Sequence, residues 1–143
     1  MNIYPGTSFL VALYVPDANS AEAARRIKRQ PEATFLLSDL AELELANALQ
    51  QRLFRKELDP AQIGAARKAF QEDVEQGVWQ RTSAQAGVVY ERAVRLAAKW
   101  TASLGTRTLD ILHVAIALET GAVSFYTFDK RQARLARAMG LKI

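Results

Sequence analysis

The sequence predicts a single α/β domain with a mostly parallel central sheet and helices on both faces. Short apolar runs alternate with helical patterns along the whole chain, and this order implies right-handed crossovers between parallel strands. The chain has 143 residues, half of them apolar, which suits one hydrophobic core and one domain over residues 1–143. In such folds ligands bind at the carboxyl ends of the strands.

In the first third of the chain, a short strand over 2–4 is followed by a turn at 5–8. The apolar residues 9–13 fit a strand or a helix by periodicity, and Thr7 or Ser8 is suited to cap a helix. Residues 20–30 have apolar positions three residues apart and basic residues opposite them, which predicts an amphipathic helix. The fully apolar run 35–37 predicts a strand.

Two helices, from Asp39 to about Lys56 and from Pro60 to Gly77, are predicted as a hairpin. Ser38 and Asp59 are expected as their N-caps, and Pro60 favours the first helical turn. The hairpin carries more apolar residues than a peripheral element needs: Leu45, Leu49, Leu53, Phe54, Ile63 and Phe70. These side chains suit either internal packing of the two helices or a partner surface.

The second half continues the alternation of strands and helices. Strands are predicted at 78–81 and 123–127, and helices within 83–103, from Thr108 to Gly121, and over 130–139. Gly140 is expected to stop the last helix, with a final edge strand over 141–143.

Several classes of protein are excluded by composition. There is no Cys, which excludes disulfides and thiolate sites, and His113 is the only histidine. A metal site must therefore use oxygen ligands, which suit Mg²⁺ or Mn²⁺. No apolar run is long enough to span a bilayer and no basic leader begins the chain, so we expect a cytoplasmic protein without a membrane partner. The formal charge of +4 mildly favours a polyanionic partner.

Three acidic residues fall where strands lead into helices. Asp129 follows the strand at 123–127, Asp110 lies in a first helical turn, and Glu44 lies one turn or so beyond another strand. If the three converge, their mutual repulsion makes the cluster costly without a divalent cation. Each also has a structural explanation, because Asp129 and Asp110 suit a helix N-terminus and Glu44 suits a solvated face. Spacing alone does not choose between Glu44 and Glu42.

The chain resembles a known family from end to end. Residues 106–117 (TRTLDILHVAIA) and 125–131 (FYTFDKR) are similar to the C-terminal motifs of PIN-domain proteins of the VapC toxin type. Residues 4–13 (YPGTSFLVAL) are similar to the opening of that family, and 44–49 (ELANAL) to its middle motif.

This resemblance implies a three-layer α/β/α PIN-like fold with a protruding helical hairpin, and a Mg²⁺- or Mn²⁺-dependent endoribonuclease that is the toxin of a toxin–antitoxin pair. It implies that Glu44, Asp110 and Asp129 are catalytic metal ligands, with Thr127 in the place of a Ser or Thr near the metal. It also implies an RNA substrate, a cognate antitoxin protein held by the hairpin, and a homodimer.

One residue departs from the family pattern. Gly6 stands where the family has its first acid, directly before Thr-Ser, and glycine supplies no side-chain oxygen. We expect weaker metal binding and an impaired nuclease, since loss of even an indirect partner of a metal typically costs about 10–100-fold. Alternatively, Gly6 only serves a tight turn. The competing functional hypotheses are a non-catalytic PIN-like module that binds RNA or an antitoxin, and a purely structural α/β protein.

The remaining candidates support these roles. Thr7 and Ser8 either reach the metal or phosphate or cap the following helix, and His113 is expected to be packed or hydrogen-bonded rather than catalytic. Basic residues expected to hold RNA phosphates around the acidic centre are Arg107, Lys130, Arg131 and Arg134. A second basic stripe, Arg25, Arg26, Lys28 and Arg29, is interpreted as a solvated helix face.

Overall fold

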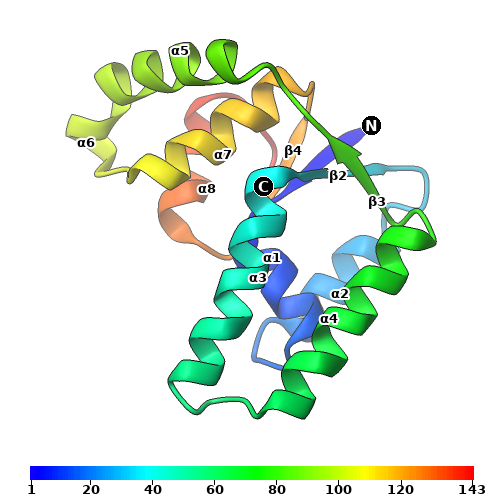
Figure 1. Cartoon of the computed structure of the whole chain (residues 1–143). Helices are drawn as coiled ribbons and strands as arrows, with labels where there is room; N and C mark the ends of the chain where they lie inside the picture. Colours follow the sequence, from blue (N-terminus) through cyan, green and yellow to red (C-terminus); the bar gives the residue numbers. More distant parts are fainter.

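The computed structural model describes residues 1–143 and contains one four-stranded parallel sheet (Figure 1). The strands are β1 (Asn2–Pro5), β2 (Thr34–Ser38), β3 (Trp79–Thr82) and β4 (Ser124–Tyr126), in the order β3-β2-β1-β4. All three strand pairs are parallel, which confirms the predicted topology.

Helices cover both faces of this sheet, giving the expected three layers (Figure 1). One side holds α1 (Thr7–Tyr14), α2 (Ser20–Lys28), α3 (Asp39–Phe54) and α4 (Pro60–Glu75). The other holds α5 (Ala86–Leu96), the π-helical turn η1 (Ala97–Thr101), α6 (Ala102–Leu104), α7 (Thr108–Glu119) and α8 (Lys130–Ala138). Each side buries its own apolar cluster against the sheet. No helix has both the length and the apolar character needed to cross a bilayer.

The sheet register brings the ends of two central strands together. Pro5 of β1 lies opposite Tyr126 of β4, and the Gly6 backbone N–H donates to the Tyr126 carbonyl at 2.8 Å. Because both strands end there, the residues that follow them, Gly6 and Thr127, are neighbours although they are far apart in the chain.

Two predictions about local structure are wrong. Thr7 and Ser8 do not cap α1: the N-cap is Gly6, without a side-chain hydrogen bond, because both hydroxyls bond to tertiary partners instead. The final edge strand is reduced to a single bridge between Ser124 and Lys142, so β4 keeps an edge that is only partly covered. Residues 9–13, for which strand and helix were both open, form part of α1.

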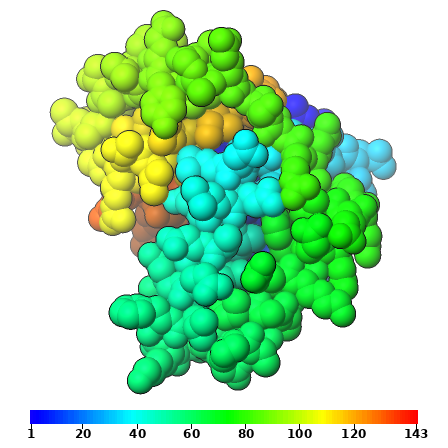
Figure 2. Space-filling model, in the orientation of Figure 1, coloured from blue at the N-terminus to red at the C-terminus, as the bar shows by residue number.

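The hairpin of α3 and α4 covers the lower part of the face shown in Figure 2, drawn in cyan to green. Ser38 and Asp59 cap its two helices as predicted. Most of its apolar side chains are accounted for by internal packing, since Leu45, Leu49, Ile63 and Phe70 are buried in the core and Leu53 is partly buried against it. Phe54, by contrast, is 87% exposed.

Candidate active site

Glu44, Asp110 and Asp129 line one pocket at the carboxyl end of the sheet. The pocket has a volume of about 380 Å³ and is walled by residues from α1, α3, α7 and α8. Its complete lining is Thr7, Ser8, Glu44, Arg107, Thr108, Leu109, Asp110, Asp129 and Gln132. The three acids therefore meet on one surface of the molecule, as expected if they share a function.

Asp110 and Asp129 are each held by backbone N–H groups at the start of a helix. Asp110 is buried, and its Oδ2 accepts from the Arg107 N–H at 3.1 Å. Asp129 is the N-cap of α8, and its Oδ1 accepts from the N–H groups of Arg131 and Gln132. The structural roles proposed for both residues are thus real. They also fix the direction of each carboxylate, because a capping side chain has little rotational freedom.

Glu44 is held by two side chains instead. Its Oε2 accepts from the Thr7 hydroxyl at 2.6 Å and also contacts Nε2 of His113. Burial raises the pKa of Glu44, but the hydrogen bonds from His113 and Thr7 outweigh it, so the net shift is downward and the carboxylate stays ionised. Glu42 forms an ion pair with Arg81, which leaves Glu44 as the acid of α3 that faces the pocket.

All three carboxylates share one arrangement: a single oxygen takes every hydrogen bond from the protein. The oxygens without a protein donor are Glu44 Oε1, Asp110 Oδ1 and Asp129 Oδ2. Oxygen donors of this kind fit Mg²⁺ or Mn²⁺. However, no three His, Cys, Asp or Glu residues lie close enough together to hold one ion. The donor chemistry fits a divalent cation, while the ligand set is incomplete.

Gly6, the residue in the place of the missing acid, has a backbone conformation that any residue adopts. Gly6 has φ −76° and ψ 164°, so no left-handed turn requires glycine there, and the tight-turn explanation is wrong. A β-carbon on this residue would lie 2.6 Å from Gln132 Oε1 and 3.4 Å from Thr127 Oγ1. The space next to Gly6 is therefore filled by the carboxamide of Gln132.

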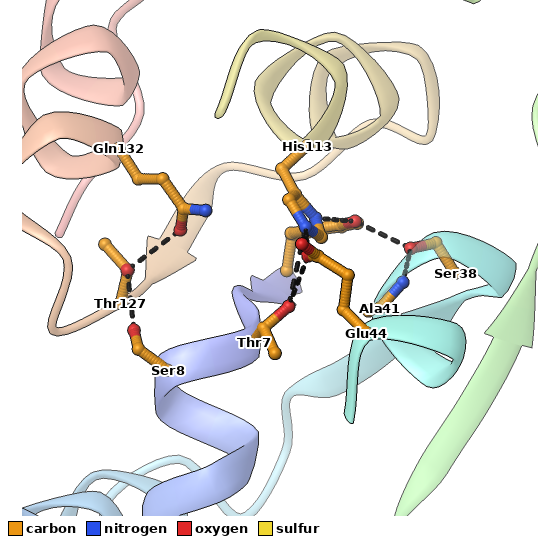
Figure 3. A network of polar contacts seen from close by, with 9 residues as sticks. Thr7, Ser8, Ser38, Ala41, Glu44, His113, Thr127 and Gln132 are labelled. Atoms are coloured by element: carbon orange, nitrogen blue, oxygen red, sulfur yellow. Dashed lines mark hydrogen bonds and ion pairs between the residues drawn. The ribbon is translucent and has the colours of Figure 1, made fainter. Parts of the chain in front are cut away.

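Figure 3 shows a chain of hydrogen bonds beside this position. The Thr127 hydroxyl donates to Gln132 Oε1 at 3.0 Å and lies 3.0 Å from the Ser8 hydroxyl. Because Thr127 gives its only proton to Gln132, Ser8 donates to Thr127. Thr127 is buried and does not line the carboxylate pocket. It joins β4 to α1 and α8, whereas Ser8 and Gln132 reach the pocket wall.

Sequence reasoning missed two parts of the site. Gln132 was not selected, although its place one turn beyond Asp129 put it near the pocket. The buried Tyr4 and Ser38 side chains, which bond to each other and continue to His113, gave no signal of their own. His113 is fully buried and hydrogen-bonded, as predicted.

The basic residues divide between two neighbouring hollows. Arg107 lines the carboxylate pocket. Lys130 and Arg134 line an adjoining groove of about 420 Å³ that shares Asp129 with that pocket. The same groove includes Arg26 and Arg137. Arg131 is exposed and lines neither hollow. The second basic stripe is partly paired, because Arg25 and Arg26 both contact Glu22.

Comparison with known proteins identifies a family for this chain and solved structures with a similar fold. The family model described as PIN domain matches residues 3–138, while no curated protein matches the chain. The solved structure of Mycobacterium tuberculosis VapC20, described as a Sarcin-Ricin loop cleaving toxin, is similar with a TM-score of 0.70 and 20% identity, covering 92% of this chain and 93% of that one.

Two further solved structures are similar along nearly the whole chain. VapBC2 from Rickettsia felis, bound to a DNA fragment from its promoter, has a TM-score of 0.65 and 16% identity, covering 99% of this chain and 96% of that one. PAE2754 from Pyrobaculum aerophilum has a TM-score of 0.61 and 18% identity, covering 99% and 83%. The family match spans nearly the whole sequence and the fold agrees with it, so this chain belongs to the PIN domain family.

Proposed function

We propose that this protein is a Mg²⁺- or Mn²⁺-dependent endoribonuclease whose activity is impaired by Gly6. The proposal rests above all on three carboxylates, Glu44, Asp110 and Asp129, that line one pocket of a PIN domain and each keep one oxygen free of protein donors. A bound divalent cation would supply an activated water and neutralise charge on the scissile phosphate. Without a carboxylate at residue 6, the pocket lacks one ligand.

RNA is the proposed substrate, held through its phosphates. Arg107 in the pocket and Lys130 beside it lie next to the carboxylates, and Arg134 and Arg137 extend the positive charge along α8. None of these four cations is paired with an acid. Arg131 is exposed in the first turn of α8 and adds to this positive charge. Unpaired cations beside a nuclease centre favour a polyanion, and an accessible single strand or loop suits a pocket of this size better than a duplex.

We also propose a toxin–antitoxin role in the cytoplasm, and the similarity of the fold to VapC20 and VapBC2 supports it. We propose that the α3–α4 hairpin binds the antitoxin and contributes to a homodimer. Between its two helices lies a hollow of about 450 Å³ lined by Leu45, Leu49 and Phe70 among others. The exposed Phe54 at the end of α3 adds an apolar contact that internal packing does not use.

Restoring an acid at residue 6 tests the nuclease proposal. Gly6→Asp adds a carboxylate, and Gly6→Asn is the matched control because it has the same shape without the charge. Both variants and the parent chain are assayed for Mn²⁺-dependent cleavage of a single-stranded RNA and for growth arrest on expression. We expect activity in Gly6→Asp that exceeds both others by at least about 10-fold, and loss of that activity in Gly6→Asp/Asp110→Asn. Equal inactivity of all variants would refute the proposal.

A second candidate, a non-catalytic PIN-like module that binds RNA or an antitoxin, is favoured by one observation. The acids do not form a ready metal-binding group, and Gly6 contributes no ligand. This candidate predicts that the parent chain binds RNA or an antitoxin and that Gly6→Asp binds equally well without cleaving. Binding and cleavage measured on the same variants separate the two candidates.

A further inference from the structure

We propose that His113 is a positioning residue for Glu44, fixed by a buried chain of hydrogen bonds that starts at the N-cap of α3. The part played by Glu44 as a metal ligand rests on the proposed function. The hydrogen bonds that hold His113, and the position of its ring proton, do not rest on that function.

This chain of hydrogen bonds joins four elements, β1, β2, α3 and α7 (Figure 3). The backbone N–H of Ala41 donates to Ser38 Oγ at 3.1 Å, and Ser38 Oγ lies 2.6 Å from the Tyr4 hydroxyl. That hydroxyl lies 2.8 Å from Nδ1 of His113, whose Nε2 contacts Glu44 Oε2. Tyr4 and His113 are fully buried and Ser38 is 3% exposed. Water therefore does not substitute for any member of the chain.

The direction of every hydrogen bond follows from its first member. A backbone N–H only donates, so Ser38 Oγ accepts from Ala41 and has its own proton to give to Tyr4. Tyr4 then donates to Nδ1 of His113, which leaves the ring proton on Nε2, facing Glu44. In the reverse direction Tyr4 would donate to Ser38, and the buried Ser38 hydroxyl would have no acceptor for its proton, which is unfavourable away from water. The hydrogen-bond geometry therefore places a ring proton of His113 on Nε2, where it faces Glu44.

This arrangement controls which oxygen of Glu44 is available. Thr7 and His113 both donate to Oε2, so Oε1 carries no protein donor. His113 also lies one turn beyond Asp110 on α7. The helix α7 thus carries the pocket carboxylate of Asp110 and also His113, which orients the carboxylate of Glu44 on α3. Without the imidazole, Thr7 alone holds the Glu44 carboxylate, and one hydrogen bond restricts its rotation less than two.

The tautomer is directly measurable because the chain has a single histidine. In the ¹⁵N spectrum of untagged, ¹⁵N-histidine-labelled protein at pH 7, we expect one folded-state ring with its proton on Nε2 and an unprotonated Nδ1. Tyr4→Phe removes the donor to Nδ1 and is expected to broaden or split this signal. A ring that carries its proton on Nδ1 instead of Nε2 in the parent chain would overturn the proposal.

Metal binding tests the consequence of the assigned geometry. Mn²⁺ affinity is measured by electron paramagnetic resonance in Gly6→Asp and in the same chain with His113→Ala or His113→Gln, after thermal unfolding has shown that each is folded. We expect about a 10–100-fold loss of affinity for His113→Ala and substantial recovery for His113→Gln, whose amide N–H can still donate to Glu44. Equal affinity of all three variants would overturn the positioning role. If Gly6→Asp binds no Mn²⁺ while the spectrum shows Nε2–H, the proposed function fails and the hydrogen-bond chain stands.

Discussion

The carboxamide oxygen of Gln132 lies 2.6 Å from the position that a β-carbon on Gly6 would take. Gln132 is buried, and its oxygen accepts from Thr127. The two residues are therefore coupled: any side chain at residue 6 requires the end of Gln132 to move. Because the contact is with the far end of a flexible side chain, the move costs about one hydrogen bond and does not disturb the backbone.

Gly6→Asp is expected to fold with a free energy of unfolding within about 1 kcal/mol of the parent at neutral pH. Displacing Gln132 costs about 1 kcal/mol for the lost hydrogen bond. Replacing glycine at a φ that all residues adopt returns about 0.4–1 kcal/mol through the unfolded chain, and Asp is a slightly better N-cap than Gly. Urea unfolding of the parent and of Gly6→Asp measures the difference.

Gln132→Ala is the control for the cost of displacing Gln132. In a Gln132→Ala background the space next to residue 6 is already empty, so we expect Gly6→Asp to be more favourable there by up to about 1 kcal/mol. Identical effects of Gly6→Asp in both backgrounds would mean that Gln132 and residue 6 do not interact.

Mn²⁺ is expected to stabilise Gly6→Asp more than the parent chain. A ligand present at 100 times its dissociation constant adds about 2.7 kcal/mol to the free energy of unfolding, and the restored carboxylate lowers that constant. The measurement is thermal unfolding with and without Mn²⁺, with Gly6→Asn as the neutral control. An equal response of Gly6→Asp and Gly6→Asn would show that the added charge plays no part in metal binding.

Replacing Arg134 and Arg137 by Gln is expected to weaken binding of single-stranded RNA and to reduce its salt dependence. Both residues line the groove beside Asp129. Each phosphate contact on a single strand contributes about −0.7 to the slope of log K against log salt concentration, so loss of two contacts flattens the slope by about 1.4. Fluorescence anisotropy at several salt concentrations, without metal, gives the slope.

The matched control for this experiment is Arg67→Gln, which removes one positive charge from the hollow between α3 and α4. We expect its slope to equal that of the parent chain. A flattening by Arg67→Gln as large as that caused by each α8 substitution would indicate a general charge effect rather than a binding groove.

Stability is expected to fall steeply above pH 10. Burial raises the pKa of Tyr4, and burial together with the hydrogen bond to Asp73 raises the pKa of Tyr14. Above the ordinary tyrosine pKa of 10.0, the unfolded chain releases these protons while the folded chain keeps them. Each such tyrosine then lowers the free energy of unfolding by about 1.4 kcal/mol per pH unit.

Urea unfolding between pH 9 and 11.5 checks this slope. Tyr14→Phe is expected to remove about 1.4 kcal/mol per pH unit of it, although it also weakens the fold at pH 7 by loss of the bonds to Asp73 and Trp79. Substitution of the exposed Tyr90 by Phe is the control and should leave the slope unchanged. An unchanged slope in Tyr14→Phe would contradict the assigned cause.

Several features of the site were accessible from the sequence because they depend on local chemistry. Ser38, Asp59 and Asp129 cap the helices that follow them, since a short polar side chain before a helix satisfies free N–H groups whatever surrounds it. The parallel order of strands followed from their alternation with helices. The choice of Glu44 over Glu42 could not be made from spacing, because the tertiary structure decides which side of α3 meets the pocket and which meets Arg81.

The sequence by itself determined the main helices, the parallel sheet and the absence of thiol ligands, because these follow from residue type and periodicity. The departure at Gly6 followed from the resemblance of the sequence to a family. Only the tertiary structure decided that Gln132 fills the space next to Gly6, that Thr7 and Ser8 bond across the fold instead of capping α1, and that His113 supports Glu44. Those outcomes depend on the parallel pairing of β1 with β4 and on the packing of α3 against α1. The hydrogen bonds around the site join residues up to 120 positions apart, and local periodicity carries no information about them.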